Sequence, residues 1–325
     1  MTVRRAALAA GAAAALAAGL VGCSAGPSPE ASSSAPAVAP FQIDSDFPDP
    51  GALVVGDRVY AYATNTPAVN VQVATSTDMK SWKVSDQDAL PELPSWALPG
   101  KTWAPGPAQL ADGRFALYFT ASDAASRYQC IGVAFADKPE GPFTSTADKP
   151  LVCPLDEGGA IDASVTADAD GQRYLVWKND GNCCGYDTWI SAQPLSADGA
   201  SLSGEPTRLI KQTESWEGHL VEAPVIVRHD DEYVLLYSAN DYSNSSYATG
   251  AATAKSLLGP YAKAKKPLLS TEGSGGRYLG PGGEDLIKFQ GKDWMLFHSW
   301  DEAFAYRGMH AVPVTWRGGL PELSR

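Results

Sequence analysis

A short apolar motif recurs five times along the chain, beginning near residues 50, 105, 162, 224 and 283. Each copy has two runs of β-branched and aromatic residues joined by a turn of Gly, Asp or both, which predicts a hairpin of antiparallel strands. A third apolar run follows every hairpin, and phrases such as 79–82 and 140–143 lead towards a fourth strand. A fixed period of this length is typical of units that bury their faces only against neighbouring copies.

Five such units of about four strands each predict an all-β fold. We expect a five-bladed β-propeller with four-stranded antiparallel blades over residues 43–325. A length of about 280 residues is ordinary for one all-β domain of this kind. No stretch of the chain has the pattern of a long amphipathic helix.

The first 22 residues predict a signal peptide, with basic residues at the start and an apolar run that ends in small residues. Leu20 to Cys23 resembles the bacterial lipobox, which implies cleavage before Cys23 and a lipid anchor on its thiol. Residues 23–42 are rich in Ser, Ala and Pro and predict a disordered tether. We expect a lipoprotein on the outer face of the bacterial cell membrane; simple secretion is the alternative.

The charge of the chain limits its partners. The formal net charge is -12, and loss of Arg4 and Arg5 with the signal peptide makes it -14. Nucleic acid is therefore not an expected partner, whereas a neutral substrate such as a carbohydrate suits the acidic surface. We expect a monomer.

Four cysteines remain once Cys23 is lipidated, an even number in an oxidising compartment. They predict a disulfide between Cys130 and Cys153 and leave Cys183 beside Cys184, which suggests a vicinal disulfide. A metal site is the alternative, but neither pair has a histidine at ligand spacing.

Acidic residues stand where the repeats begin. In a propeller the innermost strands start near the axis, so Asp49, Asp162 and Glu222 are expected to converge on one funnel beside Trp103. Carboxylates held together raise one another's pKa, and such sets suit glycosidic cleavage by a base and an acid. The plain alternative is that each acid caps a strand or forms a turn.

These segments resemble glycoside hydrolase family 43 over almost the whole chain, from Phe47 to Trp316. The resemblance implies that Asp49 is the general base, Asp162 adjusts and orients the acid, and Glu222 is the general acid. It rests on the following phrases: Phe47-Pro-Asp-Pro-Gly51, Thr102-Trp-Ala-Pro105, Ile161-Asp-Ala-Ser-Val165 and Glu217-Gly-His-Leu-Val-Glu-Ala-Pro224. Family members invert the anomeric configuration, so no covalent intermediate is implied.

The same resemblance implies a set of substrate contacts: Trp103 as an apolar wall, Arg307, Asn182 and His298. Gly283 stands where many members have a histidine that binds a central ion or water. The resemblance therefore leaves a calcium ion at the propeller axis open. Glu284 or His298 could compensate. We expect no required cofactor and no catalytic metal. The remaining histidines are interpreted as structural: His219, His229 and His310.

The sequence therefore predicts an inverting glycosidase that removes terminal or side-chain α-L-arabinofuranosyl residues from oligo- or polysaccharides. A β-D-xylosidase of the same family is the second choice. The repeats and their acids are also compatible with a non-catalytic sugar-binding propeller and with a β-fructosidase. Substrate choice is expected to lie in loops 86–101, 182–188, 212–219 and 241–249.

Overall fold

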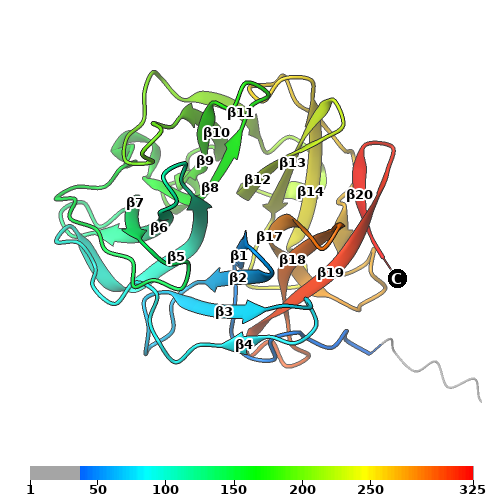
Figure 1. Ribbon diagram of the computed structural model, residues 1–325. Coiled ribbons are helices and arrows are strands. Elements are labelled where there is room, and N and C mark those ends of the chain that lie inside the picture. Colours follow the sequence, from blue (N-terminus) through cyan, green and yellow to red (C-terminus); the bar gives the residue numbers. More distant parts are fainter. Residues whose placement is uncertain (1–36, 325) are drawn as a thin grey trace, which may run out of the picture. The chain divides into compact units, whose positions relative to one another are not determined.

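Five antiparallel sheets surround a central axis, each built from one sequence repeat (Figure 1). The computed structural model describes residues 37–324. The expected signal peptide, Cys23 and the first part of the expected tether lie outside the described residues. The arrangement confirms the predicted five-bladed β-propeller, and each repeat corresponds to one blade.

The blades follow one another in chain order, with the innermost strand first in each. They consist of β1 (Gly51–Val55), β2 (Arg58–Ala63), β3 (Gln72–Ser76) and β4 (Lys83–Val84); β5 (Ala97–Gln109), β6 (Phe115–Asp123) and β7 (Gln129–Ala136); β8 (Ala160–Ala167), β9 (Arg173–Asn179), β10 (Trp189–Pro194) and β11 (Thr207–Lys211); β12 (Val221–His229), β13 (Glu232–Ala239), β14 (Ala248–Ala254), β15 (Ala262–Lys263) and β16 (Leu269–Ser270); and β17 (Leu279–Phe289), β18 (Lys292–Trp300), β19 (Arg307–Arg317) and β20 (Leu320–Leu323).

The outer edges of the blades differ from one another. Blades one, three and five have four strands each. In blade two the place of the fourth strand is taken by isolated bridges, Phe135 with Thr144 and Ile131 with Val152. In blade four two short strands, β15 and β16, both pair with β14. The repeat is therefore most regular near the axis and least regular at the rim.

The innermost strands pack against one another around the axis, each against its neighbours in the ring. This packing brings backbones very close together. A Cβ atom at Gly51 would overlap the carbonyl oxygen of Pro105, and one at Gly106 would overlap that of Ala163. Glycine at these two positions therefore lets adjacent blades approach, which no larger residue permits.

One buried aromatic residue from the second strand of every blade fills the space between the sheets. Burying a large apolar side chain stabilises the folded state by roughly 1.5–3 kcal/mol. These residues are at most 3% exposed: Tyr62, Tyr118, Trp177, Tyr237 and Phe297.

The ring is closed by pairing between the two ends of the described chain. The backbone N–H of Gln42 donates to the carbonyl of Met309 at 2.9 Å, and Ile43 forms a bridge to Met309 in β19. The Phe41 ring packs against His310, with 4.6 Å between ring centroids. The sequence predicts a tether that ends at residue 42. Ala39 is already buried, so the packed part of the chain begins before residue 43.

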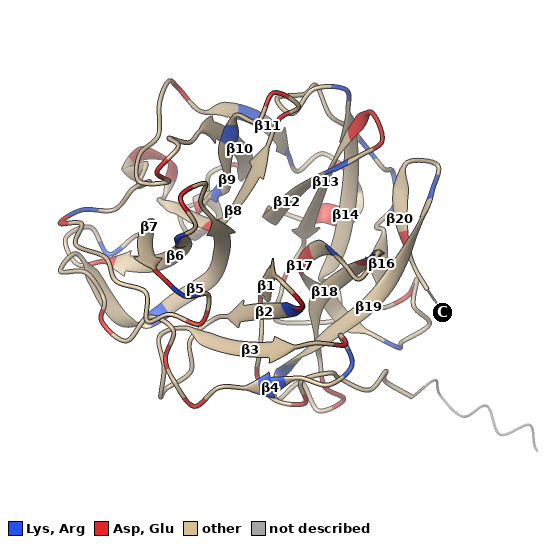
Figure 2. Cartoon of the chain, viewed as in Figure 1, with Lys and Arg blue, Asp and Glu red and all other residues tan. Residues whose placement is uncertain are grey.

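Loops and outer strands carry most of the charged residues (Figure 2). The only helical segments in residues 37–324 are three 3-10 turns, η1 (Leu155–Glu157), η2 (Gly181–Cys183) and η3 (Ser215–Glu217). No helix in that range has the length and apolar character needed to cross a membrane. A disulfide joins Cys130 in β7 to Cys153 ahead of η1.

Candidate active site

A residue in the left-handed region, where φ is positive, stands at the equivalent point of every blade, just before β1 and at a break in the pairing register of β5, β8, β12 and β17. The five residues are Asp49 (56°), Ala104 (41°), Asp162 (59°), Ala223 (49°) and Gly283 (58°). A non-glycine residue in this region stores about 1 kcal/mol or more of strain, so its recurrence in four blades indicates a feature of the fold. Asp49 and Asp162 occupy this position, as expected. Glu222 does not: it precedes the left-handed residue by one, as Trp103 does.

Asp49 is surrounded by groups that favour its ionised form. The Thr64 hydroxyl donates to Oδ2 at 2.7 Å, and the Arg307 guanidinium lies 3.5 Å from Oδ1. Burial alone would raise the pKa of Asp49, but the charge of Arg307 and the hydrogen bond from Thr64 outweigh it and hold the pKa well below 3.8. Asp49 is therefore a carboxylate able to accept a proton.

His298 supports Asp49 from behind. Its Nδ1 lies 3.1 Å from the backbone N–H of Asp49 and accepts a hydrogen bond from it. Burial and the nearby Arg307 charge lower the pKa of His298, so the ring is neutral and carries its proton on Nε2. A Cβ at Gly283 would collide with the His298 ring and with Asp49 Oδ1, which explains why a side chain is missing at that position.

Asp162 holds a proton more firmly than an ordinary carboxyl. Burial raises its pKa well above 3.8, the negative charge of Glu222 raises it further, and Lys178 opposes both. Its Oδ2 accepts the N–H of Ala223 at 2.9 Å, so Asp162 also fixes the peptide that follows Glu222. Asp162 is therefore the group in the pocket that most readily keeps a proton beside Glu222.

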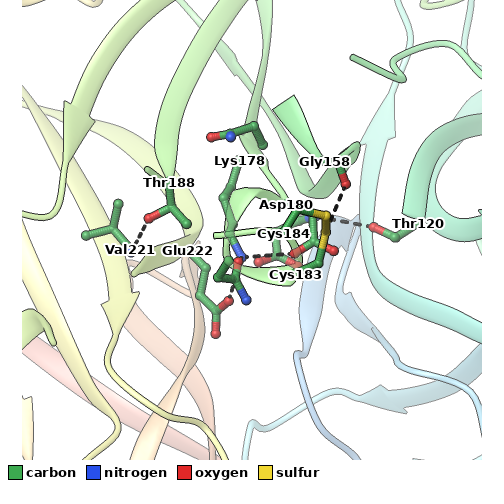
Figure 3. Close-up of polar contacts among 12 residues, drawn as sticks. Thr120, Gly158, Lys178, Asp180, Cys183, Cys184, Thr188, Val221 and Glu222 are labelled. Carbon is green, nitrogen blue, oxygen red and sulfur yellow. Dashed lines mark hydrogen bonds and ion pairs between the residues drawn. A yellow bond between two sulfur atoms is a disulfide. The ribbon is translucent and has the colours of Figure 1, made fainter. Parts of the chain in front are cut away.

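Both carboxylate oxygens of Glu222 have partners, of which Lys178 is labelled in Figure 3. Lys178 Nζ donates to Oε2 at 3.1 Å, and the Tyr247 hydroxyl donates to Oε1 at 2.7 Å. Burial and the charge of Glu222 raise the pKa of Tyr247 well above 10, so its hydroxyl stays a donor. These two contacts fix the direction in which the Glu222 side chain points.

The three acids line one pocket of about 450 Å³. Its wall combines residues from all over the sequence, which only the closed ring brings together. Trp103, Asn182 and Arg307 belong to it, and so does His219, which the sequence analysis had interpreted as structural. A concave pocket with convergent acids and an aromatic wall is the usual form of a site for a small neutral ligand.

A family model for glycosyl hydrolases family 43 matches residues 42–321. The chain belongs to glycoside hydrolase family 43. It is therefore a glycoside hydrolase, as its sequence predicted.

Relatives of this family 43 chain cover most of its length. It is 27% identical to an extracellular endo-α-(1→5)-L-arabinanase of Bacillus subtilis (strain 168), over 84% of this chain and 85% of that protein. It is also 27% identical to an extracellular exo-α-(1→5)-L-arabinofuranosidase of Cellvibrio japonicus (strain Ueda107), over 86% of each. The crystal structure of a thermostable family-43 glycoside hydrolase superposes with a TM-score of 0.77 at 25% identity, covering 89% of this chain and 96% of that one.

The family 43 site differs from the sequence expectation in its histidines. His298 is completely buried and lies behind Asp49 outside the pocket lining, so it contacts Asp49 in place of the expected contact with substrate. His229 stacks on Trp316, and His310 contacts the Ser299 hydroxyl.

Sequence reasoning also missed Lys178, Tyr247 and Thr64. Lys178 had a visible signal, because it is a lysine inside the apolar run Tyr174-Leu-Val-Trp-Lys178. Tyr247 and Thr64 had none: each lies in the same blade as the acid it contacts, directly before β14 and directly after β2, and no sequence pattern marks either residue.

Two buried polar atoms bear on the calcium ion that the family resemblance left open. Glu284 Oε1 and His298 Nε2 have no hydrogen-bond partner. Calcium takes six to eight oxygen ligands, yet residues 37–324 contain no group of three or more His, Cys, Asp or Glu side chains that could hold a metal ion. In this tautomer His298 Nε2 is a donor. The residues therefore do not fit a calcium ion held by side chains, and we derive no catalytic step from one.

Proposed function

We propose that this chain is an inverting α-L-arabinofuranosidase that removes terminal or side-chain arabinofuranosyl residues from arabinose-containing oligo- and polysaccharides. The main support is the opposite effect of the pocket on its acids, since the pKa of Asp49 is lowered and that of Asp162 is raised. Groups whose surroundings move their pKa values apart are suited to act as base and acid.

In the proposed reaction, Asp49 takes a proton from a water molecule whose oxygen attacks the anomeric carbon. The bond from that carbon to the glycosidic oxygen breaks as Glu222 donates a proton to the departing oxygen. The configuration at the anomeric carbon inverts once. Asp162 holds the peptide that follows Glu222, and Arg307 keeps Asp49 ionised. Proton exchange with solvent restores both acids.

Two relatives, equally similar to this chain, are named for endo and exo action on α-(1→5)-L-arabinan or its arabinofuranosyl ends. They support arabinose as the glycone but do not separate the two modes. An aromatic rim cluster (Tyr242, Trp300 and Phe304) beside the pocket supports a leaving group that is itself a sugar. Trp300 Nε1 donates to the Tyr242 carbonyl at 2.8 Å, and Tyr242 and Phe304 are 51% and 41% exposed.

The test is hydrolysis of nitrophenyl α-L-arabinofuranoside, β-D-xyloside and β-D-galactoside and of arabino-oligosaccharides. We expect activity on the arabinofuranoside, with kcat reduced by about 10² to 10⁴ in Asp49→Ala. Glu222→Ala should lose more on oligosaccharides than on the nitrophenyl sugar, because nitrophenolate leaves without a donated proton. Activity on the xyloside alone would favour the xylosidase, and sugar binding without hydrolysis the non-catalytic propeller.

We propose further that the chain is secreted and held by lipid on Cys23. The signal-like segment 1–22 and the extracellular names of two relatives support this. Metabolic labelling with palmitate should mark the wild type and not Cys23→Ser, and release of the wild type into the medium without label would indicate simple secretion.

A further inference from the structure

The ammonium group of Lys178 is completely buried between three acceptors (Figure 3). Nζ donates to Asn182 Oδ1 at 2.6 Å, to Glu222 Oε2 at 3.1 Å and to Asp180 Oδ1 at 3.4 Å. An ammonium group has three N–H donors, so each acceptor takes one. Glu222 therefore shares the charge of Lys178 with two residues that lie in the short segment 180–184.

A disulfide between neighbours, Cys183 and Cys184, closes that segment. Cys183 Sγ lies 3.6 Å from the Gly158 carbonyl, and the Cys184 N–H donates to the Gly181 carbonyl at 3.0 Å. The adjacent Asn182 and Cys183 both line the pocket. Asn182 itself is exposed, so the turn that the disulfide closes is what directs its side chain towards Lys178.

We propose that the Cys183–Cys184 disulfide is a positioning element for the acid, which holds Asn182 Oδ1 on Lys178 Nζ and thereby sets how much of the lysine charge reaches Glu222. The proposal rests on the proposed function only in taking Glu222 as the acid. The other charged or titratable groups facing this network are Asp49, Asp162, Asp180, Tyr247 and His298.

Breaking the disulfide should free Asn182 and leave the third N–H of Lys178 to the remaining carboxylates. A cation that bonds more strongly to a carboxylate favours its ionised form. The acid then loses its proton at lower pH. We expect the alkaline limb of the kcat/KM profile to move down by about half a pH unit, which is about a threefold loss above the limb.

Chemical reduction is a second route to the same state. Cys183 is exposed, whereas Cys130 of the other disulfide is completely buried. A small dithiol gives two electrons and two protons to the pair, which becomes two thiols while the reagent becomes a cyclic disulfide. Brief exposure to dithiothreitol should therefore shift the profile as the substitution does.

The experiment compares Cys183→Ser/Cys184→Ser with the matched control Cys130→Ser/Cys153→Ser, which removes the other disulfide. Asn182→Ala should reproduce the shifted limb, and combining it with the Cys183→Ser/Cys184→Ser change should add nothing further, because both remove one contact. The control should lose thermal stability without moving the limb.

Titration of the Asp162 carboxyl by ¹³C NMR, assigned with Asp162→Asn, supplies a readout that needs no activity. The charge of Lys178 already lowers the pKa of Asp162 against the effect of burial. That pKa should fall further in Cys183→Ser/Cys184→Ser and in Asn182→Ala. If the wild type hydrolyses no glycoside, the proposed function fails and this titration still decides the positioning role.

An unchanged Asp162 titration and an unchanged pH limb in folded Cys183→Ser/Cys184→Ser protein would overturn the proposal. If that variant does not fold, Asn182→Ala and the briefly reduced wild type decide it by the same two measurements.

Discussion

Arg307 contributes to the charge state of Asp49 from the last blade, with 3.5 Å between its guanidinium and the carboxylate. Arg307→Met removes that positive charge, so the pKa of Asp49 should rise. The base then stays protonated to a higher pH, and the acidic limb of the kcat/KM profile should move upwards by about one pH unit. The exposed Arg317, which pairs with Glu322, provides the control substitution Arg317→Met. If the acidic limb lies at the same pH in Arg307→Met and Arg317→Met, Arg307 does not set the charge of Asp49.

At the same scale, the sequence led to most of the pocket but not to its electrostatics. Asp49, Asp162 and Trp103 could be found because each stands at the start of a recognisable repeat. The contact of Tyr247 with Glu222 could not, because it joins two separate strands of blade four, and the contact of Lys178 with Glu222 could not, because it depends on how blades three and four meet. A side chain's partner across a sheet boundary leaves no local pattern in the sequence.

Among the elements, β15 is tied to the turn η3 by a buried ion pair. Lys263 Nζ lies 2.7 Å from Glu217 Oε1, and the Tyr237 hydroxyl donates to the same oxygen at 2.7 Å. Lys263→Met leaves the completely buried Glu217 charge without its cation and should lower the free energy of unfolding by about 3–5 kcal/mol. Urea denaturation measures this.

The control for that measurement is Lys265→Met, which removes an exposed pair with Glu214 and should cost about 1 kcal/mol or less. Similar losses for both lysines would show that the Glu217 pair behaves like a surface contact.

The rim cluster on the loops after β13 and β18 should serve the leaving group. Trp300→Ala should reduce kcat/KM on arabinotriose about tenfold, because an aromatic face stacked on a sugar ring is lost. On the nitrophenyl sugar the change should stay within about twofold, since that substrate does not reach the cluster. Trp82→Ala, beside β4 on the outer edge of blade one, is the matched tryptophan control. If kcat/KM falls equally on both substrates, Trp300 maintains the structure of the pocket and does not bind the leaving group.

Element by element, the inner hairpins were predictable and the outer strands were not. Each hairpin combines a turn with two alternating apolar runs, whereas β4, β15 and β16 have two residues each. So short a strand has no periodicity to detect, and the bridge between Phe135 and Thr144 replaces a strand altogether in blade two.

For the whole molecule, buried carboxyls on β17 should make stability depend on pH. Burial raises the pKa of Glu284 to about 7 from 4.5, although Ser238 and Thr249 donate to it. The folded state therefore binds more protons than the unfolded chain between these pH values. The stabilisation that comes from this bound proton is complete below about pH 4.5. As the pH rises to about 7, the free energy of unfolding should fall by about 3 kcal/mol.

Thermal unfolding of Glu284→Gln across this pH range provides the check, with exposed Glu302→Gln as the control. The midpoint of thermal unfolding of Glu284→Gln should change less with pH than that of Glu302→Gln. Asp285, whose pKa burial raises to about 6, should leave a smaller slope of the same sign.

The pairing of Ile43 with Met309 also determines when the first blade can be completed during synthesis of the chain. A chain is synthesised from its N-terminus, so residues 42–47 emerge well before their partners in β19. Until then the first blade has an unpaired flanking segment, and Asp49 lacks both His298 and Arg307. The base is completed only when the final blade arrives, so a prematurely terminated chain cannot acquire the pocket's chemistry.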